Sequence, residues 1–229
     1  MLALTCLATL LTIEASPVSA VQPATVSAFD APYYGAPATT GSAVVGIAAT
    51  PSGDGYYVLR ANGEVDGYGV TSYGSLAANS LPVGITATGI ALDATTGGYW
   101  ILTSNGSVRA FNAPSYGETL VPSGGWGQHP AAVAIAAAPS GVGYYVLRAN
   151  GAVYGYGVKS HGSLAGTLHY GTTAPVLAVG IAVDSATGGY WVATSTGGVA
   201  AFDAAGDGVP APPRGPEQRQ PGHCDRGVT

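Results

Sequence analysis

The feature that most constrains this chain is a sequence unit that occurs four times in nearly complete form. Residues 45–74 match residues 133–162 best, and residues 87–117 match residues 179–205 best, so two types of unit alternate. The first residue of an aromatic pair marks each unit, at Tyr56, Tyr99, Tyr144 and Tyr190, with spacings of 43, 45 and 46 residues. A partial copy precedes them at residues 26–35. A period of this length indicates an architecture in which each unit packs on its neighbours.

Within each unit, the residue pattern predicts short antiparallel strands joined by tight turns. In the first unit, a run of small and branched residues (Val45–Thr50) is followed by an aromatic-led run (Tyr56–Ala61) and a third run (Val65–Tyr68). The Asn-Gly pair between the last two runs favours a type I′ hairpin turn, because both residues tolerate positive φ. We place this turn at Asn62-Gly63, Asn105-Gly106, Asn150-Gly151 and Gly197-Gly198. The segment that ends in an aromatic residue or His plus Gly is a candidate fourth, outer strand.

We therefore expect an all-β fold, namely a β-propeller or an open propeller arc of about four blades. Three or four short antiparallel strands every 43–46 residues is the size of a propeller blade. A β-solenoid and a sandwich are the alternatives, but solenoid coils are usually shorter and a sandwich would not repeat so closely. In runs such as Tyr56–Leu59, the residues that point to either face of the strand are all apolar. This fits sheets that are covered on both faces by neighbouring blades.

A set of residues recurs in fixed order. In the first unit they are Gly46-Ile47-Ala48, Thr50-Pro51, Gly55-Tyr56-Tyr57, Asn62-Gly63, Val65, Tyr68-Gly69 and Tyr73-Gly74, and the second and fourth units supply Gly98-Tyr99-Trp100 and Gly189-Tyr190-Trp191. This order closely resembles a tandem repeat of secreted actinobacterial proteins, over about residues 26–205. The resemblance implies a propeller-type binding or scaffold region. Such repeats sometimes accompany a separate cell-wall hydrolase domain, which is not visible in this sequence, so the resemblance transfers no catalytic residue.

The first twenty residues resemble a secretory signal peptide. An apolar run from Leu2 to Ile13 precedes Val18-Ser19-Ala20, a small-residue cleavage pattern. The basic start that such signals usually have is missing, so an ordinary buried N-terminal segment is the alternative. The apolar run is too short for a membrane span. We expect a secreted or cell-surface protein with no stable membrane span after removal of residues 1–20.

The repeat pattern stops at Ala204, within the fourth unit. We divide the chain into residues 1–20 (signal peptide), 21–203 (repeat domain) and 204–229, which are rich in Pro and hold three of the six Arg residues. Two explanations stay open for the last segment: a disordered tail, or a frame shift near Ala205 after which further repeats follow. In the first case a small closed ring of four or five blades is expected, and in the second an open arc with an unpaired blade face.

Composition excludes several classes of function. Charged residues make up only 8% of the chain and the net charge is −5, so no basic patch is present and nucleic acid is not an expected partner. Cys6 and Cys224 lie outside the repeats, which therefore hold no disulfide. The sequence contains none of the hydrolase, metal-binding or nucleotide-binding motifs that we sought. We therefore assign no catalytic residue, no metal ligand and no cofactor.

Polar residues at repeat positions are interpreted as structural. His161 and His169 lie eight residues apart around a loop and make a weak zinc site without a nearby carboxylate. Asp30, Asn112 and Asp203 share one repeat position, where the side chain is expected to cap a turn by bonding the backbone two residues further on. The turns that begin at Asp93 and Asp184 are expected to be capped in the same way.

The recurring aromatic residues are expected to form the core between blades, with a minority on a rim where they would suit sugar rings. They are Tyr57, Trp100, Tyr145 and Trp191 in one set and Tyr68, Phe111, Tyr156 and Phe202 in the other. Arg60 and Arg148 occupy matching sites before two of the Asn-Gly turns. The structural prediction for them is a hydrogen bond across blades, and the functional one is an anion contact at one end of the channel.

Export, repeats and the absence of catalytic motifs lead to one functional hypothesis. We expect a non-enzymatic binding or scaffold module at the cell surface, with an envelope glycan or a protein as its partner and with unknown binding residues. A hydrolase or lyase with its site in the propeller channel is the alternative, because function resides in the site rather than in the fold. A truncated gene product without function is the third possibility.

Overall fold

The computed structural model describes residues 26–76, 80–118, 130–168 and 175–205, which form only strands, turns and loops. The strands make four separate three-stranded antiparallel sheets, here called blades 1 to 4 in chain order. Blade 1 holds β1 (Val44–Ala49), β2 (Tyr56–Arg60) and β3 (Val65–Tyr68); blade 2 holds β4 (Ala87–Leu92), β5 (Tyr99–Thr103) and β6 (Val108–Phe111); blade 3 holds β7 (Ala132–Ala137), β8 (Tyr144–Arg148) and β9 (Val153–Tyr156); blade 4 holds β10 (Ala178–Val183), β11 (Tyr190–Thr194) and β12 (Val199–Phe202). The predicted all-β fold of repeated units is confirmed.

Each blade is a meander in which the second strand lies in the middle. All five residues of β2, β5 and β8 are buried, and each of these strands pairs on both edges. β5 and β8 lie between two blades, whereas the outer side of β2 contacts the segment before β1, through Tyr34 on Tyr56 and Ala38 on Arg60. The register of the first strand shifts between its first and third residues in every blade, as between Val44 and Gly46. Because this β-bulge recurs at the same repeat position in all four blades, we infer that the repeat sequence specifies it.

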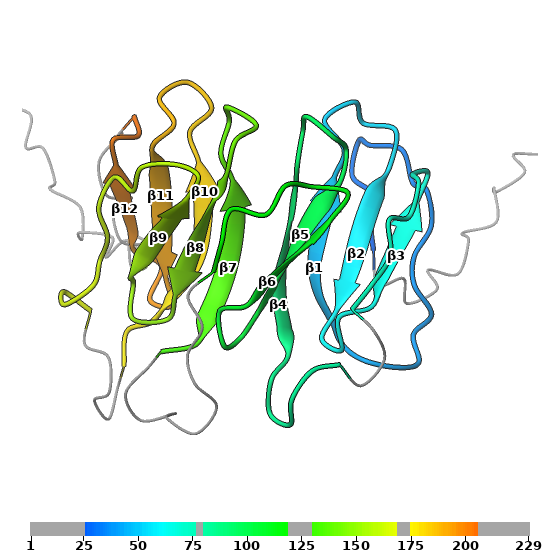
Figure 1. Cartoon of the computed structure of the whole chain (residues 1–229), viewed down its shortest axis with the longest axis horizontal. Coiled ribbons are helices and arrows are strands. Elements are labelled where there is room, and N and C mark those ends of the chain that lie inside the picture. The colour runs from blue at the N-terminus through cyan, green and yellow to red at the C-terminus, as the bar shows by residue number, and fades with distance from the viewer. Residues whose placement is uncertain (1–25, 77–79, 119–129, 169–174, 206–229) are drawn as a thin grey trace, which may run out of the picture.

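Neighbouring blades meet through their first strands. β4 contacts β1 on one side and β7 on the other, and β7 contacts β10. Backbone hydrogen bonds join them, since Ala87 N–H donates to the Ala61 carbonyl and Ala132 N–H donates to the Ser104 carbonyl. β1 and β10 do not contact each other, so the four blades form an open row in which blades 1 and 4 are the ends (Figure 1).

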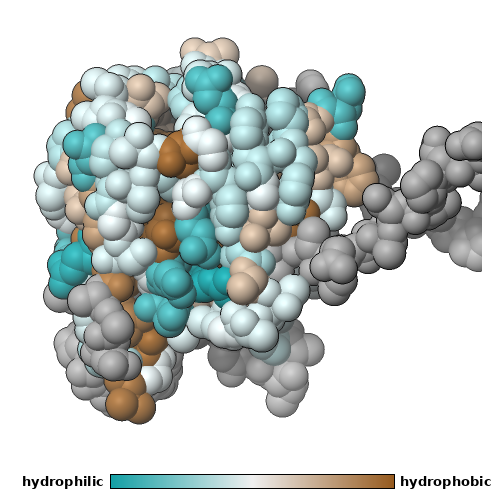
Figure 2. Space-filling view, turned by 90° about the vertical axis from the view of Figure 1, so that its right-hand side faces the viewer, coloured by the Kyte–Doolittle hydropathy of each residue, from teal (hydrophilic) through white to brown (hydrophobic). Residues whose placement is uncertain are grey.

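Three hydrophobic clusters fill the three spaces between blades. The cluster between blades 2 and 3 contains Trp100, Leu102 and Val108 from one blade and Ile135 and Tyr144 from the other. Within the described residues, no blade packs on the outer faces of blades 1 and 4, and Ile47 on blade 1 is 56% exposed whereas its equivalent Ile135 is 8% exposed. Figure 2, which faces the blade 1 end, shows hydrophobic atoms open to solvent among polar ones.

The turn between the second and third strands differs from the predicted type I′ turn. Only the glycine has positive φ, at Gly63, Gly106, Gly151 and Gly197. Gly63 N–H donates to the Arg60 carbonyl and Arg60 N–H donates to the Glu64 carbonyl, so the loop has three residues and ends in a left-handed glycine. In blade 4 this glycine is Gly197, with Thr196 in the place of Asn, so the prediction of Gly197-Gly198 was one residue too late.

The aromatic-Gly segment is not a fourth strand in any described blade. It crosses to the next blade, where the first tyrosine of the middle strand donates a hydrogen bond to the glycine carbonyl. The pairs are Tyr56 with Gly35, Tyr99 with Gly74, Tyr144 with Gly117 and Tyr190 with Gly162. Because Gly35 belongs to the partial copy at residues 26–35, that copy supplies to blade 1 the contact that each complete unit supplies to the next blade.

Two regions with predicted features lie outside the described residues: the proposed signal peptide at 1–20 and the segment after Ala205. The described residues contain no helix with the length and apolarity that a membrane span needs.

Candidate functional site

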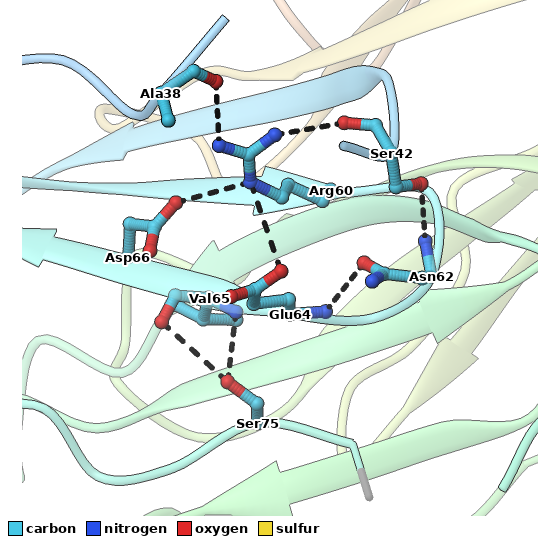
Figure 3. A network of polar contacts seen from close by, with 8 residues as sticks. All are labelled: Ala38, Ser42, Arg60, Asn62, Glu64, Val65, Asp66 and Ser75. Atoms are coloured by element: carbon cyan, nitrogen blue, oxygen red, sulfur yellow. Dashed lines mark hydrogen bonds and ion pairs between the residues drawn. The ribbon is translucent and has the colours of Figure 1, made fainter. Parts of the chain in front are cut away.

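The densest polar network of blade 1 surrounds Arg60 at the end of β2 (Figure 3). The guanidinium donates from Nε to Asp66 Oδ2 at 3.2 Å, from Nη1 to the Ser42 carbonyl at 2.9 Å and from Nη2 to the Ala38 carbonyl at 2.9 Å. Glu64 Oε2 lies 3.8 Å from Nε. The Arg60 side chain is only 7% exposed. Burial removes water from its guanidinium, and these partners supply hydrogen bonds in place of that water.

This network gives Arg60 a structural role. Ala38 and Ser42 lie in the segment that leads into β1, so the bonds hold that segment to its own blade, and the prediction of a bond across blades was wrong. Arg148 similarly donates to the Pro130 carbonyl in the segment before β7, at 2.9 Å. Both side chains are buried, at 6% and 3% residue exposure, which does not fit an anion contact on a rim.

A hollow lies beside this network, between the Asn-Gly turns of blades 1 and 2. It consists of two adjoining hollows, of about 290 Å³ and about 270 Å³, whose linings share Leu81 and Ile85 and which are together called the hollow. The first is lined by Ser42, Ala61, Asn62, Leu81, Ile85 and Thr86, and the second by Leu76, Ser80, Leu81, Pro82, Ile85, Thr103, Asn105, Ser107 and Arg109. Apolar residues from the connection between blades are thus combined with amide, hydroxyl and guanidinium groups from two turns.

The turns fix the polar groups of the hollow. Asn62 Oδ1 accepts from Glu64 N–H, and Asn105 Oδ1 accepts from Ser107 N–H, both at 3.1 Å. These bonds orient both amides through the side-chain oxygen, and Asn105 Oδ1 also accepts from the Thr103 hydroxyl at 2.6 Å. The NH₂ group of each amide can donate two further bonds. Arg109 has a side chain that is 60% exposed, with Nη1 3.8 Å from Glu118 Oε2. The hollow can therefore offer several hydrogen-bond donors to an uncharged or weakly acidic ligand.

The sequence did not single out this hollow. Leu81 and Ile85 belong to the connection between units, which varies from one unit to the next, and Arg109 stands where the fourth unit has Ala200. The repeated Asn-Gly turns were identified, but as hairpin signals. That two of them flank a hollow depends on how the blades lie side by side, which the repeat pattern alone does not give.

His161 pairs with a carboxylate, Asp203. Its Nδ1 lies 2.8 Å from Asp203 Oδ2, and its backbone N–H donates to the Tyr190 hydroxyl at 3.0 Å. His161 stands where other units have Tyr73 and Tyr116, so the pair fastens the end of unit 3 to blade 4. His169 lies outside the described residues. In the described part of the chain, no three His, Cys, Asp or Glu residues are close enough to hold a metal ion.

Asp93 and Asp184 cap their turns, as predicted. Asp93 accepts from Thr95 N–H at 2.9 Å and from the Thr96 hydroxyl at 2.8 Å, and Asp184 makes the equivalent bonds to Ala186 and Thr187. The backbone N–H groups of Ala186 and Ala205, and then the Thr187 hydroxyl, hold the pKa of Asp184 below its usual range because they favour the carboxylate.

Asp30, Asn112 and Asp203 have a different role from the predicted cap. Their φ angles are 51°, 49° and 50°, and Gly69 and Gly157 occupy the same position in units 1 and 3 with φ of 70° and 72°. The position requires a left-handed backbone, which Gly, Asn and Asp tolerate best. The side chains bond elsewhere, since Asn112 Nδ2 donates to the Thr96 carbonyl at 3.1 Å and Asp203 pairs with His161.

The recurring aromatic residues form the interblade core, as predicted, except at the ends of the row. Tyr57, Trp100 and Tyr145 are at most 2% exposed, and burial raises the pKa of Tyr57 and Tyr145 because it disfavours the phenolate. Their equivalent in blade 4, Trp191, is only partly buried. The exposed aromatic residues of the partial copy are Phe29, Tyr33 and Tyr34, at 87%, 55% and 38%.

Searches of known protein families and of curated proteins found no family model and no protein that matches this chain.

Proposed function

We propose that this chain is a β-propeller or an arc of one, of the exported actinobacterial type that its repeats resemble, and that it acts as a binding module at the cell surface. The observation that supports binding is the hollow between the turns of blades 1 and 2. Its lining comes from two blades and from the connection between them, so a ligand there would contact groups that only the assembled row brings together.

The chemistry of the hollow favours a glycan of the cell envelope as the ligand. Asn62 and Asn105 supply amides and Arg109 an exposed guanidinium, while Leu81 and Ile85 add apolar side chains to the lining. The Ser107 hydroxyl donates to Glu118 Oε2 at 2.9 Å, so its oxygen can accept from a ligand. Sugar hydroxyls bind amide and guanidinium donors, and the C–H faces of a sugar ring pack on apolar side chains. None of the described residues that line the hollow is aromatic, so the proposed mode relies on hydrogen bonds rather than on ring stacking.

The test is sedimentation of the purified full chain with insoluble envelope glycan. Arg109→Ala combined with Asn105→Ala should weaken binding at least tenfold, because both donors line the hollow. The matched control is Asn150→Ala, which removes the same turn bond in blade 3, to Ala152 N–H, from a turn that does not line the hollow. Binding of the wild-type chain no stronger than that of the heat-denatured chain would refute the glycan proposal. Equal loss in the double variant and in the Asn150 control would refute the assignment of the hollow.

A further inference from the structure

The two ends of the row repeat the two halves of an interface that already exists inside the molecule. Blade 4 is of the same type as blade 2, and blade 1 is of the same type as blade 3. The outer face of blade 4 therefore corresponds to the blade 2 side of the 2–3 interface, and the outer face of blade 1 corresponds to the blade 3 side. Inside the molecule, these two types of face pack on each other around the cluster that contains Trp100 and Tyr144.

The blade 1 end holds its aromatic residues in the arrangement that receives Trp100 inside the molecule. Tyr34 and Tyr56 lie 6.0 Å apart at 68°, and their equivalents Tyr116 and Tyr144 lie 6.0 Å apart at 71°. Trp100 packs on that internal pair, with its ring centroid 6.1 Å from Tyr116 and 5.1 Å from Tyr144. In the described chain, the blade 1 end thus has the same aromatic pair without a tryptophan on it, with Tyr34 38% and Tyr56 8% exposed.

The blade 4 end supplies the matching tryptophan. Trp191 is the equivalent of Trp100 and keeps the same local bond, because its Nε1 donates to the Ala205 carbonyl at 3.0 Å as Trp100 Nε1 donates to the Pro114 carbonyl at 2.7 Å. No aromatic partner of Trp191 is found in the described residues. Beside it, Val199 is 36% exposed, whereas its equivalent Val108 is 7% exposed.

The partial copy at residues 26–35 completes the match. Unit 4 follows unit 2 as far as Ala205, the equivalent of Pro114, and then departs from it. Tyr33, Tyr34 and Gly35 are the equivalents of Ser115, Tyr116 and Gly117, and they already lie on blade 1 through the bond from Tyr56 to Gly35. The blade 1 end therefore carries an aromatic-Gly segment of the kind that the described part of unit 4 does not contain. Val26–Phe29 resembles the sequence of β12. It does not take the place of β12 as the third strand of blade 4, because β12 itself is paired with β11.

Among the described residues, the end faces expose apolar side chains among polar ones, as Figure 2 shows for the blade 1 end. Terminal repeats of soluble proteins usually have a polar outer face. Here Ile47 and Val44 on blade 1 are 56% and 37% exposed, and Val199 adds an apolar side chain at the other end. Among the equivalents of the buried residues of the internal cluster, two differ in size: blade 4 has the smaller Ala193 in the place of Leu102, and blade 1 has the larger Val44 in the place of Ala132.

We propose that the occupant of each end face is a second copy of this chain, with blade 4 of one copy packed on blade 1 of the other. Two copies have two such head-to-tail joints, each with Trp191 against Tyr34 and Tyr56. An interface of this kind forms a closed ring when its rotation closes. Two copies of four blades give eight blades, within the range of known propellers. This inference does not depend on the glycan ligand, and its test has a different readout.

Sedimentation velocity of the full chain at micromolar concentration gives the first test. The expected mass is twice the chain mass of 22.5 kDa. Ile47→Asp on one end face and Val199→Asp on the other should each weaken dimer formation at least tenfold, because each places a charge in an apolar joint. The matched control is Val142→Asp, which changes a 48% exposed valine in a turn where the first unit naturally has Asp54. Tyr34→Ser is a second variant of the blade 1 end, for use if Ile47→Asp unfolds.

Mixing the two end variants tests the head-to-tail direction. Ile47→Asp leaves the blade 4 end intact and Val199→Asp leaves the blade 1 end intact, so a mixture should form dimers through one native joint although neither variant does so alone. A monomeric wild-type chain would overturn the proposal, as would dimers that persist in both variants. Unlimited fibres would overturn the closed ring, and a mixture no more dimeric than its components would overturn the head-to-tail pairing.

Discussion

At the residue scale, one tyrosine in each unit joins neighbouring blades. The hydroxyls of Tyr99, Tyr144 and Tyr190 donate to the glycine carbonyl of the preceding unit, and their rings lie in the cores between blades. Tyr56 makes the same bond to Gly35 of the partial copy, at the blade 1 end. A phenylalanine would fill the same space without the hydrogen bond. This explains why the first residue of the aromatic pair is tyrosine in all four units, whereas the second alternates between tyrosine and tryptophan.

Replacing one such tyrosine should measure the bond between blades. Tyr144→Phe leaves the Gly117 carbonyl without its donor, so we expect the free energy of unfolding to fall by about 1 kcal/mol. Urea unfolding followed by far-ultraviolet circular dichroism gives the value. Tyr154→Phe is the control, because this ring is 39% exposed and packs over Arg148, a contact that phenylalanine retains. The same change in both variants would contradict a specific role for the Tyr144 hydroxyl.

The raised pKa of Tyr144 predicts that the free energy of unfolding falls at alkaline pH. Burial raises the pKa of its hydroxyl to about 12, whereas an unfolded tyrosine ionises near pH 10. Between these two pH values the unfolded chain loses a proton that the folded chain keeps. The contribution of the Tyr144 hydroxyl to the free energy of unfolding is therefore fully present below about pH 10 and is lost as the pH rises to about 12.

The measurement is urea unfolding at a series of pH values from neutral to alkaline. The free energy of unfolding of the wild-type chain should fall above about pH 10, and the fall should be shallower in Tyr144→Phe, which has one fewer ionising group. Burial also raises the pKa of Tyr99, so part of the slope remains in the variant. An identical slope in both proteins would show that Tyr144 ionises alike in the folded and unfolded chains.

At the element scale, the glycine of each hairpin turn must adopt a positive φ, and in some turns it must also leave room for a residue of another segment. Gly63 and Gly197 have nearly the same φ, 86° and 85°, because both end a three-residue loop. Their surroundings differ. A Cβ at Gly63 would lie 2.5 Å from Leu76 Cδ1, in the segment that crosses towards blade 2, whereas a Cβ at Gly197 would meet nothing within 4 Å.

Alanine at these two glycines separates the two requirements. Gly197→Ala should cost about 1–2 kcal/mol for the left-handed backbone alone. Gly63→Ala should cost distinctly more, because Leu76 must also move. Urea unfolding of both variants checks the order, and the reverse order or equal costs would mean that the backbone alone determines the glycine in both turns.

The elements also show where sequence patterns were sufficient. The third strands were predicted with their observed limits, Val65–Tyr68 and Val108–Phe111, since a turn on one side and a left-handed residue on the other confine them. The turn type was wrong because Asn favours positive φ but also caps a three-residue loop with its Oδ1, as Asn62 does. The proposed fourth strand was wrong because its backbone bonds to the next blade, and no local pattern reveals a partner in another unit.

At the scale of the whole molecule, stability should vary along the row. Blades 2 and 3 are covered on both faces, whereas blades 1 and 4 have one face without a neighbour in the described chain. We expect amide hydrogens of β11 to exchange faster than those of β5 and β8 in dilute solution, because opening an end blade disrupts one interface instead of two. Hydrogen exchange followed by mass spectrometry checks this order.

The same experiment reports on association of the ends. Protection of β11 should increase with protein concentration while that of β5 and β8 changes little, and the Ile47→Asp variant should lose this dependence. Slow exchange of β11 at every concentration, equal to that of β5, would mean that the blade 4 face is already covered within one chain.

The sequence by itself determined the all-β class, the number of repeated units, the strand positions and the apolar character of both faces, because these depend on local patterns that recur. It also indicated capping by Asp93 and Asp184, whose partners lie within three residues. Only the tertiary structure decided that Arg60 is enclosed by the segment before β1, that two turns flank a hollow, and that Tyr34 and Tyr56 lie at one end of the row and Trp191 at the other. These features depend on contacts between residues far apart in the chain, and an open row brings such residues together only after the blades have packed.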